Sequence, residues 1–255
     1  MSKYIDDLVS VIIPVYNAEK FVSYTLDSVI NQDYKNIEII IIDDCSKDNS
    51  FDIISKYMAL DSRIKYHKME ENSGVALARN KGVELASGRF IAYVDSDDIW
   101  LPNKLSTQLE LFKVHPNTPL TYTAIEYIDE NNELIKGKRK LKESITYGKL
   151  QRNTLIATST VMIDRNVVEE IKMPNRRSGE DYSLWLNILK KYGKAYGINE
   201  VFTRYRKSSN SLSSKKSKEL KVFYNVQRED LKINPVKVLF NMCFYILNAI
   251  KKHYF

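Results

Sequence analysis

Short apolar runs alternate with amphipathic segments along the first hundred residues of the chain. The apolar runs cover residues 8–14, 37–42 and 90–94, and their length and content of β-branched residues predict buried strands. The amphipathic segments at 21–30 and 50–60 place apolar residues on one side and predict helices. Strands that alternate with helices predict an α/β fold with a mostly parallel sheet.

The same patterning continues to about residue 207. It predicts helices at 75–86, 102–114 and 181–190, strands at 64–67 and 160–164, a hairpin of 120–128 with 134–135, and a basic loop at 136–142. No linker-like change in composition divides this region. We therefore expect one domain at 1–207, a basic flexible segment with a linker helix at 208–232, and an amphipathic C-terminal helix at 233–255.

Acidic residues follow the third apolar run directly. Asp95, Asp97 and Asp98 occupy three of the four positions after it, at the strand end where open α/β sheets bind ligands. Neighbouring carboxylates repel by roughly 1 to 4 kcal/mol per pair, and Mg²⁺ or Mn²⁺ would relieve that repulsion while leaving room for phosphate oxygens. The alternative is an acidic turn that caps the helix starting near residue 102. The spaced glycines of a dinucleotide site are absent after the first strand, which argues against nicotinamide and flavin cofactors.

Four segments resemble, in order, the sequence blocks of family 2 glycosyltransferases. They read VSVIIPVYNAEKF, IEIIIIDDCSKDNS, NSGVALARNKGVELASGRFIAYVDSDDIWLP and SGEDYSLWL. TYGKLQRNTLIATSTVMIDR and KAYGINEVFTRYRKSSNSLSS are further similar to bacterial enzymes of capsule, O-antigen and teichuronic acid assembly. The resemblance implies a GT-A fold, in which one Rossmann-like domain binds both nucleotide and acceptor, and an inverting transfer from a nucleotide sugar.

The first two blocks carry the candidate nucleotide pocket. Pro14 stiffens the end of the first strand, and Tyr16 offers an aromatic face for a base. Asp44 is suited to accept the imide N–H of uracil and matches a uracil contact of the family, which favours a UDP-sugar; Asp43 is an accessory candidate. Both aspartates are also common turn-capping residues. Arg79, in the motif Ala-Arg-Asn, matches a family arginine near the nucleotide, and its guanidinium suits a diphosphate.

By resemblance, Asp95 and Asp97 form the DxD motif of the family. Asp97 would bind Mn²⁺ or Mg²⁺ directly, and Asp95 would contact the ribose or the water shell of the metal. Asp98 is an accessory candidate or the cap of the next helix. The cation would bridge the two phosphates and stabilise the departing nucleotide.

The last two blocks supply the candidate base. Asp181 matches the catalytic base of the family, and an inverting displacement needs one such carboxylate to take the proton of the acceptor hydroxyl. Glu180 precedes it, and both acids are also suited to cap the helix that begins near residue 182. Trp185 either lines the acceptor site or belongs to the core. Many relatives carry a histidine where this chain has Ser208, so Arg206 or Lys207 is a candidate for neutralising charge there.

The net charge of +7 raises the question of an anionic partner. No nucleic-acid-binding motif accompanies the lysines, so we expect no nucleic acid partner and favour an anionic membrane surface. The apolar segment 235–252 is interrupted by Asn241 and Asn248 and is too short to span a bilayer. It predicts a helix in the membrane interface, or alternatively one packed on the domain or on a second subunit.

Two features indicate a cytoplasmic protein. Cys45 and Cys243 are isolated from one another, as in reducing compartments, and residues 1–7 lack the apolar core of a signal peptide. We therefore expect a peripheral enzyme on the inner face of the plasma membrane, with a lipid-linked glycan acceptor; homo-oligomerisation stays open. The competing hypothesis is a non-catalytic nucleotide-binding subunit that docks a partner through its C-terminal helix. A nucleotidyltransferase would need a phosphate loop with glycine and lysine after the first strand, which is missing.

Overall fold

The computed structural model describes residues 3–139, 141–153, 156–207 and 216–254. Its N-terminal half is a parallel sheet with the order β3-β2-β1-β4. The strands are β1 (Ile5–Val15), β2 (Ile37–Asp43), β3 (Ile64–Lys68) and β4 (Gly88–Tyr93). They are connected by α1 (Val22–Ile30), α2 (Ser50–Leu60) and α3 (Val75–Leu85). This half confirms the α/β alternation predicted from the apolar runs.

The sheet continues as a mixed sheet through a short strand, β9 (Met162–Asp164), which pairs antiparallel with both β4 and β6 (Leu120–Ile128). Beyond it, β10 (Ala195–Arg206) runs parallel to β6 and pairs antiparallel with β5 (Ile99–Trp100) and β8 (Ser144–Ile145). The hairpin partner of β6 is β7 (Leu134–Arg139). The loop predicted at 136–142 is thus wrong for its first residues, because an edge strand tolerates lysines that show no apolar alternation.

Helices cover both faces of the sheet, and alternate residues of β1 belong to two separate cores. Val11 and Ile13 pack with α1, α2 and α4 (Lys104–Val114), whereas Ile12 packs with α3 and α6 (Glu180–Tyr192). This alternation follows from the two-residue period of a strand. Gly82 allows α3 to approach closely, since a Cβ there would lie 2.4 Å from Ile12 Cγ2.

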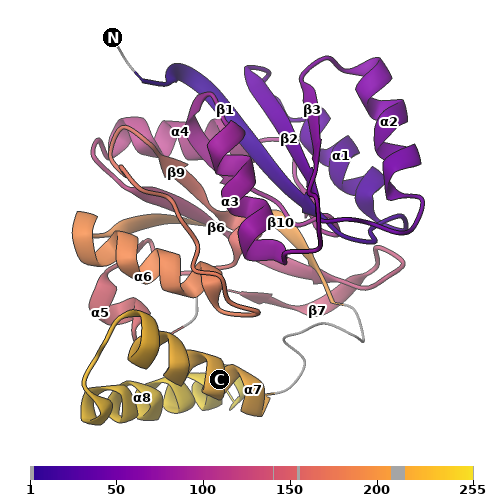
Figure 1. Ribbon diagram of the computed structural model, residues 1–255. Coiled ribbons are helices and arrows are strands. Elements are labelled where there is room, and N and C mark those ends of the chain that lie inside the picture. The colour runs from indigo at the N-terminus through magenta and orange to yellow at the C-terminus, as the bar shows by residue number, and fades with distance from the viewer. Residues whose placement is uncertain (1–2, 140, 154–155, 208–215, 255) are drawn as a thin grey trace.

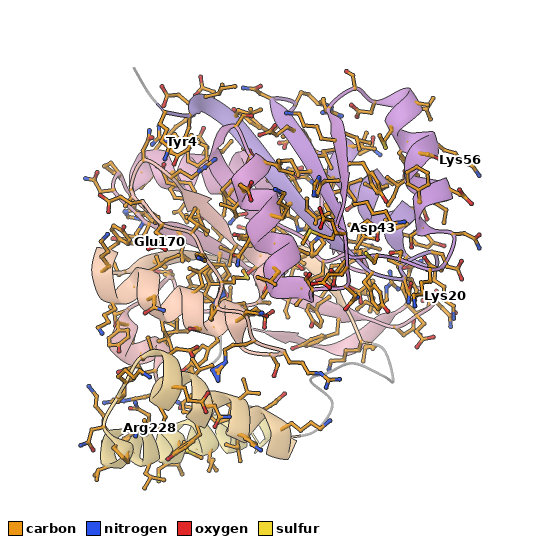
Figure 2. The ribbon with its side chains drawn as sticks, viewed as in Figure 1. Tyr4, Lys20, Asp43, Lys56, Glu170 and Arg228 are labelled. Atoms are coloured by element: carbon orange, nitrogen blue, oxygen red, sulfur yellow. The ribbon has the colours of Figure 1, made fainter. Side chains whose placement is uncertain are left out.

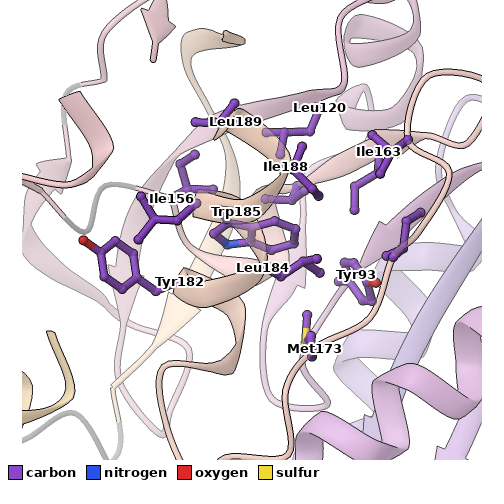
Figure 3. Close-up of a cluster of buried hydrophobic side chains, with 14 of the residues drawn as sticks. Tyr93, Leu120, Ile156, Ile163, Met173, Tyr182, Leu184, Trp185, Ile188 and Leu189 are labelled. Atoms are coloured by element: carbon purple, nitrogen blue, oxygen red, sulfur yellow. The ribbon is translucent and has the colours of Figure 1, made fainter. Parts of the chain in front are cut away.

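Trp185 lies in the core on the α6 side of the sheet. Its side chain is 1% exposed, and its ring packs against Tyr93 with centroids 6.2 Å apart. Figure 3 shows it surrounded by the apolar side chains of this cluster. The acceptor-site role considered for Trp185 is therefore corrected to a core role, because a buried ring offers no surface to an acceptor.

The C-terminal segment folds back onto the domain as a helical hairpin. It comprises α7 (Lys216–Asn225), the π-helical turn η2 (Val226–Asp230) and α8 (Pro235–Tyr254), and it lies against α6 and α5 (Tyr147–Leu150) in Figure 1. Phe223, Val226 and Val238 are buried in this contact. From residue 216 onward the segment is therefore packed on the domain, whereas the rest of the flexible segment predicted from 208 lies outside the described residues.

A buried polar network fixes this hairpin. The Gln227 amide donates to the Gln151 carbonyl oxygen at 2.8 Å and to the Tyr182 hydroxyl at 3.1 Å, and accepts from Asn241 at 2.8 Å. Asn241, which interrupts the apolar pattern of the sequence, is thus a buried partner that sets the orientation of α8. In the part of the chain that the structure describes, no helix has the length and hydropathy needed to cross a membrane.

Candidate active site

The carboxyl ends of β1 and β2 meet at Asp44. Its backbone N–H donates to the Val15 carbonyl oxygen at 2.8 Å, and its carboxylate accepts the N–H groups of Ser73 at 2.7 Å and Gly74 at 2.8 Å. The turn before α3 is therefore held against the end of β2. Asp44 is 4% exposed, and each of its carboxylate oxygens keeps a second lone pair that can accept an N–H.

The other candidates of the nucleotide pocket divide into exposed and internal residues. Tyr16 is 49% exposed and offers a ring face, whereas Pro14 is buried in β1. Asp43 is buried as well; it accepts the Ser46 N–H at 2.7 Å and the Tyr66 hydroxyl at 2.6 Å. Figure 2 shows Asp43 inside the molecule at this end of the sheet. The accessory nucleotide role expected of Asp43 is thus replaced by the turn-capping alternative.

The acidic loop after β4 is a tight turn anchored by two residues. The Asp98 N–H donates to the Asp95 carbonyl oxygen at 3.1 Å, and the Asp98 carboxylate accepts the Arg206 N–H at 2.9 Å. Burial, together with Asp97 and Asp95, raises the pKa of Asp98 well above its ordinary value. Asp98 therefore anchors the turn from inside and does not cap α4, whose N-cap residue is Asn103.

Arg206 holds the same turn from β10. Its Nε donates to the Asp97 carbonyl oxygen at 2.8 Å and its Nη1 to the Asp129 carbonyl oxygen at 2.6 Å, and its guanidinium lies 4.3 Å from the centre of the Phe21 ring. Its Nη2 also donates to Asn132 Oδ1 at 2.7 Å, so all three nitrogens of the guanidinium are engaged by the loops. Ser208, at the position where the resemblance led us to expect a histidine, lies outside the described residues.

Asp95 and Asp97 fit a divalent cation. Burial and the neighbouring Asp95 raise the pKa of Asp97 to about 6, and the positive charge of Arg206 opposes this shift only in part. The Asp95 side chain is 28% exposed and therefore accessible. Among the described residues no group of three histidines, cysteines or acids could hold a metal ion alone. A cation here would take these hard oxygen ligands from the protein and complete its shell elsewhere.

Arg79 joins the acidic loop to the start of α6. Its Nη2 donates to Asp95 Oδ1 at 2.5 Å and its Nη1 to Glu180 Oε1 at 2.8 Å. Burial disfavours the charge of this side chain, but Asp95 and Glu180 outweigh that effect and raise the pKa of Arg79. The guanidinium expected to contact a diphosphate is thus engaged with two carboxylates, so its role here is to connect the two halves of the site.

Asp181 occupies the first turn of α6, after Gly179 in a left-handed conformation. Its Oδ2 accepts the Thr158 hydroxyl at 2.8 Å, and its Oδ1 accepts the Tyr182 N–H at 2.6 Å. Glu180 beside it is buried; burial and Asp181 raise the pKa of Glu180, while Arg79 opposes this shift. Asp181 is partly exposed, and one lone pair on each of its oxygens remains for a proton donor.

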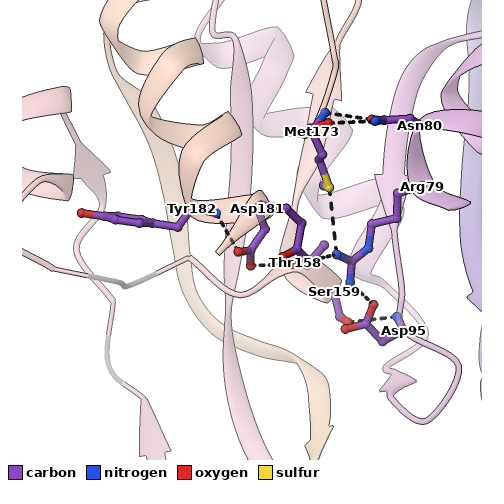
Figure 4. Close-up of polar contacts among 9 residues, drawn as sticks. Arg79, Asn80, Asp95, Thr158, Ser159, Met173, Asp181 and Tyr182 are labelled. Carbon is purple, nitrogen blue, oxygen red and sulfur yellow. Dashed lines mark hydrogen bonds and ion pairs between the residues drawn. The ribbon is translucent and has the colours of Figure 1, made fainter. Parts of the chain in front are cut away.

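Three polar residues of the site were not predicted from the sequence. Asn80 clamps the segment before α6, because its side-chain amide exchanges two hydrogen bonds of 2.8 Å with the backbone of Met173. Thr158 and Ser159 contact Asp181 and Asp95, respectively. Figure 4 shows these contacts side by side around Arg79. Asn80 was visible as part of the Ala-Arg-Asn motif, whereas nothing in the local pattern distinguishes Thr158 and Ser159.

The fold is that of a GT-A glycosyltransferase. Residues 10–172 match the family model described as Glycosyl transferase family 2, and the chain belongs to this family. The chain is 41% identical over 245 residues to TuaG of Bacillus subtilis, named for teichuronic acid biosynthesis, covering 96% of this chain and 97% of that protein. It is also 41% identical over 251 residues to WfgD of Escherichia coli, covering 98% and 96%. WfgD is named as a UDP-Glc:α-D-GlcNAc-diphosphoundecaprenol β-1,3-glucosyltransferase.

Solved structures show the same fold. The Staphylococcus aureus TarS structure spanning its residues 1–349 superposes with a TM-score of 0.70 at 21% identity, covering 93% of this chain and 70% of that one. A mannosyltransferase of Pyrobaculum calidifontis, solved with GDP-Man and Mn²⁺, superposes with a TM-score of 0.69 at 15% identity, covering 89% and 64%. These likenesses confirm the GT-A architecture expected from the sequence blocks.

Proposed function

We propose that the protein is an inverting, divalent-metal-dependent glycosyltransferase that moves a sugar from a UDP-sugar to a hydroxyl of a lipid-linked glycan in bacterial surface polysaccharide biosynthesis. The observation that carries this proposal is the cluster formed by Asp95, Arg79, Glu180 and Asp181. In this cluster the buried Arg79 contacts Asp95 on one side and Glu180, the neighbour of the partly exposed Asp181, on the other.

The donor side supports a uridine nucleotide. Asp44 lies at the adjoining strand end with lone pairs free for an imide N–H, and Tyr16 is exposed for stacking. TarS, which shares the fold, is described in complex with UDP-GlcNAc, and WfgD is named for UDP-Glc. Both support a UDP-sugar as the donor of this protein.

The cation would be held by Asp97 with Asp95, either directly or through its water shell. When bound, it neutralises the charge that develops on the departing nucleoside diphosphate. Arg206 and Asp98 keep the acidic turn in place from behind. Arg79 keeps Asp95 in a fixed orientation, so that the two carboxylates are presented without rearrangement.

The acceptor side centres on Asp181. As general base it takes the proton of the attacking hydroxyl while that oxygen displaces the nucleotide from the anomeric carbon. A single displacement of this kind inverts the configuration. The name of WfgD supports this, because UDP-glucose carries an α-linked sugar and the product is β-1,3-linked. Glu180, buried against Arg79, orients the first turn of α6 and does not reach the acceptor.

Helix α8 supports attachment to an anionic phospholipid surface. The face opposite its buried side exposes Val236, Leu239, Phe240, Phe244 and Leu247, which follow the spacing of one helix face. Basic side chains accompany it: Lys237 is exposed, and the Arg152 guanidinium lies 4.9 Å from the centre of the Phe244 ring. An exposed apolar stripe with cations beside it fits the lipid interface, where a lipid-linked acceptor resides.

A transfer assay tests the catalytic proposal. The purified protein is incubated with a panel of UDP-sugars that includes UDP-Glc and UDP-GlcNAc, a synthetic GlcNAc-diphospholipid, and either Mn²⁺ or EDTA. The proposal expects product with Mn²⁺ only, and a β linkage by NMR. Product with an α linkage would contradict inversion, and UDP binding without transfer or donor hydrolysis would favour the non-catalytic subunit.

Vesicle sedimentation tests the attachment. The double variant L239S/F240S is compared with L60S, which removes a leucine that is 86% exposed on α2, a helix elsewhere on the molecule. We expect the wild type and L60S to sediment with phosphatidylglycerol vesicles in low salt, and the double variant to stay in solution. Equal sedimentation of all three proteins would show that α8 does not face the membrane.

A further inference from the structure

The turn η1 (Thr158–Thr160) contacts both halves of the active site. Its first residue donates a hydrogen bond from Thr158 Oγ1 to Asp181 Oδ2 at 2.8 Å. Its second residue accepts one, from the Asp95 N–H to Ser159 Oγ at 3.1 Å. Two adjacent side chains thus reach the proposed base and the start of the acidic loop (Figure 4).

The turn itself is fixed from several sides. Thr158, Ser159 and Thr160 are 6%, 0% and 1% exposed. The Ser159 carbonyl oxygen accepts Trp100 Nε1 at 2.7 Å, and the Thr160 carbonyl oxygen accepts Gln108 Nε2 at 3.1 Å. Because the turn is buried and its carbonyl groups are hydrogen-bonded to β5 and α4, it cannot move together with the Asp181 carboxylate. It therefore restricts the rotation of that carboxylate.

The chemistry of the contact agrees with a positioning role. An ionised carboxylate only accepts hydrogen bonds, so the Thr158 hydroxyl must point its proton at Asp181. That bond and the Tyr182 N–H together occupy one lone pair on each carboxylate oxygen. The carboxylate is thereby held at both oxygens, and one lone pair on each oxygen remains to accept a proton donor.

We propose that Thr158 is a positioning residue for the base Asp181, and that the adjacent side chains of Thr158 and Ser159 set the base relative to the acidic loop. This inference rests on the proposed function, since it requires Asp181 to act as the base. The Thr158 hydroxyl would position the base without taking a direct part in the reaction.

The test compares T158V, which keeps the shape and removes the hydroxyl, with T158S, which keeps the hydroxyl. The matched control is T160V. It removes the Thr160 hydroxyl, which donates to the Ala157 carbonyl oxygen at 2.6 Å in the same turn and touches neither Asp181 nor Asp95. Single-turnover rates, the KM for the donor and the pH dependence of the rate are measured for each variant, alongside thermal unfolding. T158A replaces T158V if the latter does not fold.

For T158V we expect a rate about tenfold lower or more, with the donor KM unchanged. The acidic limb of its pH profile should move up by about one unit, because a hydrogen bond to the charged carboxylate is lost. T158S should restore both the rate and the limb, and T160V should resemble the wild type.

A wild-type rate and an unmoved acidic limb in T158V would overturn the inference, as would an equal loss in T160V. D181N separates this outcome from a failure of the proposed function. If D181N is inactive while T158V behaves as wild type, only the inference fails; if D181N transfers sugar normally, the assignment of the base fails with it.

Discussion

Asp97 is held in a setting that disfavours its charge. Burial and the Asp95 carboxylate raise its pKa to about 6 in the folded protein, against about 3.9 in an unfolded chain. Between these values the folded state binds more protons, so its stability falls as the pH rises from about 4 to 6. The destabilisation is complete above pH 6 and absent below pH 4. Such a cost is expected where a cation is to be bound.

Replacing Asp97 by asparagine should therefore stabilise the protein in EDTA at pH 8. We expect D97N to melt about 2 to 4 °C above the wild type there, with the difference vanishing near pH 4. The measurement is thermal unfolding across this pH range, with E130Q, an exposed acid in the β6–β7 turn, as the control. A gain that stays constant with pH would contradict the assigned charge.

Arg79 and Glu180 form a buried ion pair whose members are 5% and 8% exposed. R79M would leave Glu180 and Asp95 without their counter-charge and should lower the free energy of unfolding by about 3 to 5 kcal/mol. K113M removes an exposed surface pair with Glu110 and should leave the free energy of unfolding almost unchanged. Denaturant titration measures both. Addition of E180Q to R79M should recover part of the loss; no recovery would show that the charge of Glu180 is not the cause.

At the scale of elements, the start of α6 depends on Gly179. Its φ of +79° is in the left-handed region, and a Cβ there would lie 2.5 Å from Val222 Cγ1 on α7. Gly193, at the other end of α6, has a φ of +98° and open space around it. A substitution at Gly193 therefore tests backbone strain alone, whereas a substitution at Gly179 tests strain together with overpacking.

We expect G193A to destabilise by about 1 to 3 kcal/mol through backbone strain, since its φ of +98° and ψ of −127° favour glycine. G179A combines left-handed strain of about 1 to 2 kcal/mol with overpacking of about 1 to 3 kcal/mol. The double variant G179A/V222A should be less destabilised than the sum of its single variants, as measured by denaturant titration. Strict additivity would refute the clash with α7.

Some elements of the fold could be predicted from the sequence, and others could not. The strands β1, β2 and β4 were predictable from their apolar runs, and the acids that follow the runs of β2 and β4 drew attention to Asp44, Asp95 and Asp97. The strand β9 has only three residues, and its antiparallel pairing on both sides arises from tertiary contacts. The pairing of Arg79 with Glu180, 101 residues apart, had no local signal either. For the same reason Trp185 could not be assigned to core or site.

At the scale of the whole molecule, the C-terminal hairpin connects the active site to the proposed lipid surface. One side of α8 is tied through Asn241 and Gln227 to Tyr182, the residue after the proposed base. The other side exposes Leu239 and Phe240. The orientation of the exposed face of α8 is thus set relative to α6. Docking of this face on the membrane would therefore also orient Asp181 toward a lipid-linked acceptor.

In the proposed mechanism Asp97 and its cation bind the donor, whereas Asp181 removes the proton of the acceptor. The most direct measurement compares D181N and D97N for Mn²⁺-dependent UDP affinity by calorimetry and for sugar transfer to the diphospholipid acceptor. We predict that D181N binds UDP like the wild type and transfers about a hundredfold more slowly or worse, whereas D97N loses the Mn²⁺-dependent part of UDP binding. Normal transfer by D181N, or undiminished Mn²⁺-dependent binding of UDP by D97N, would contradict this division of roles.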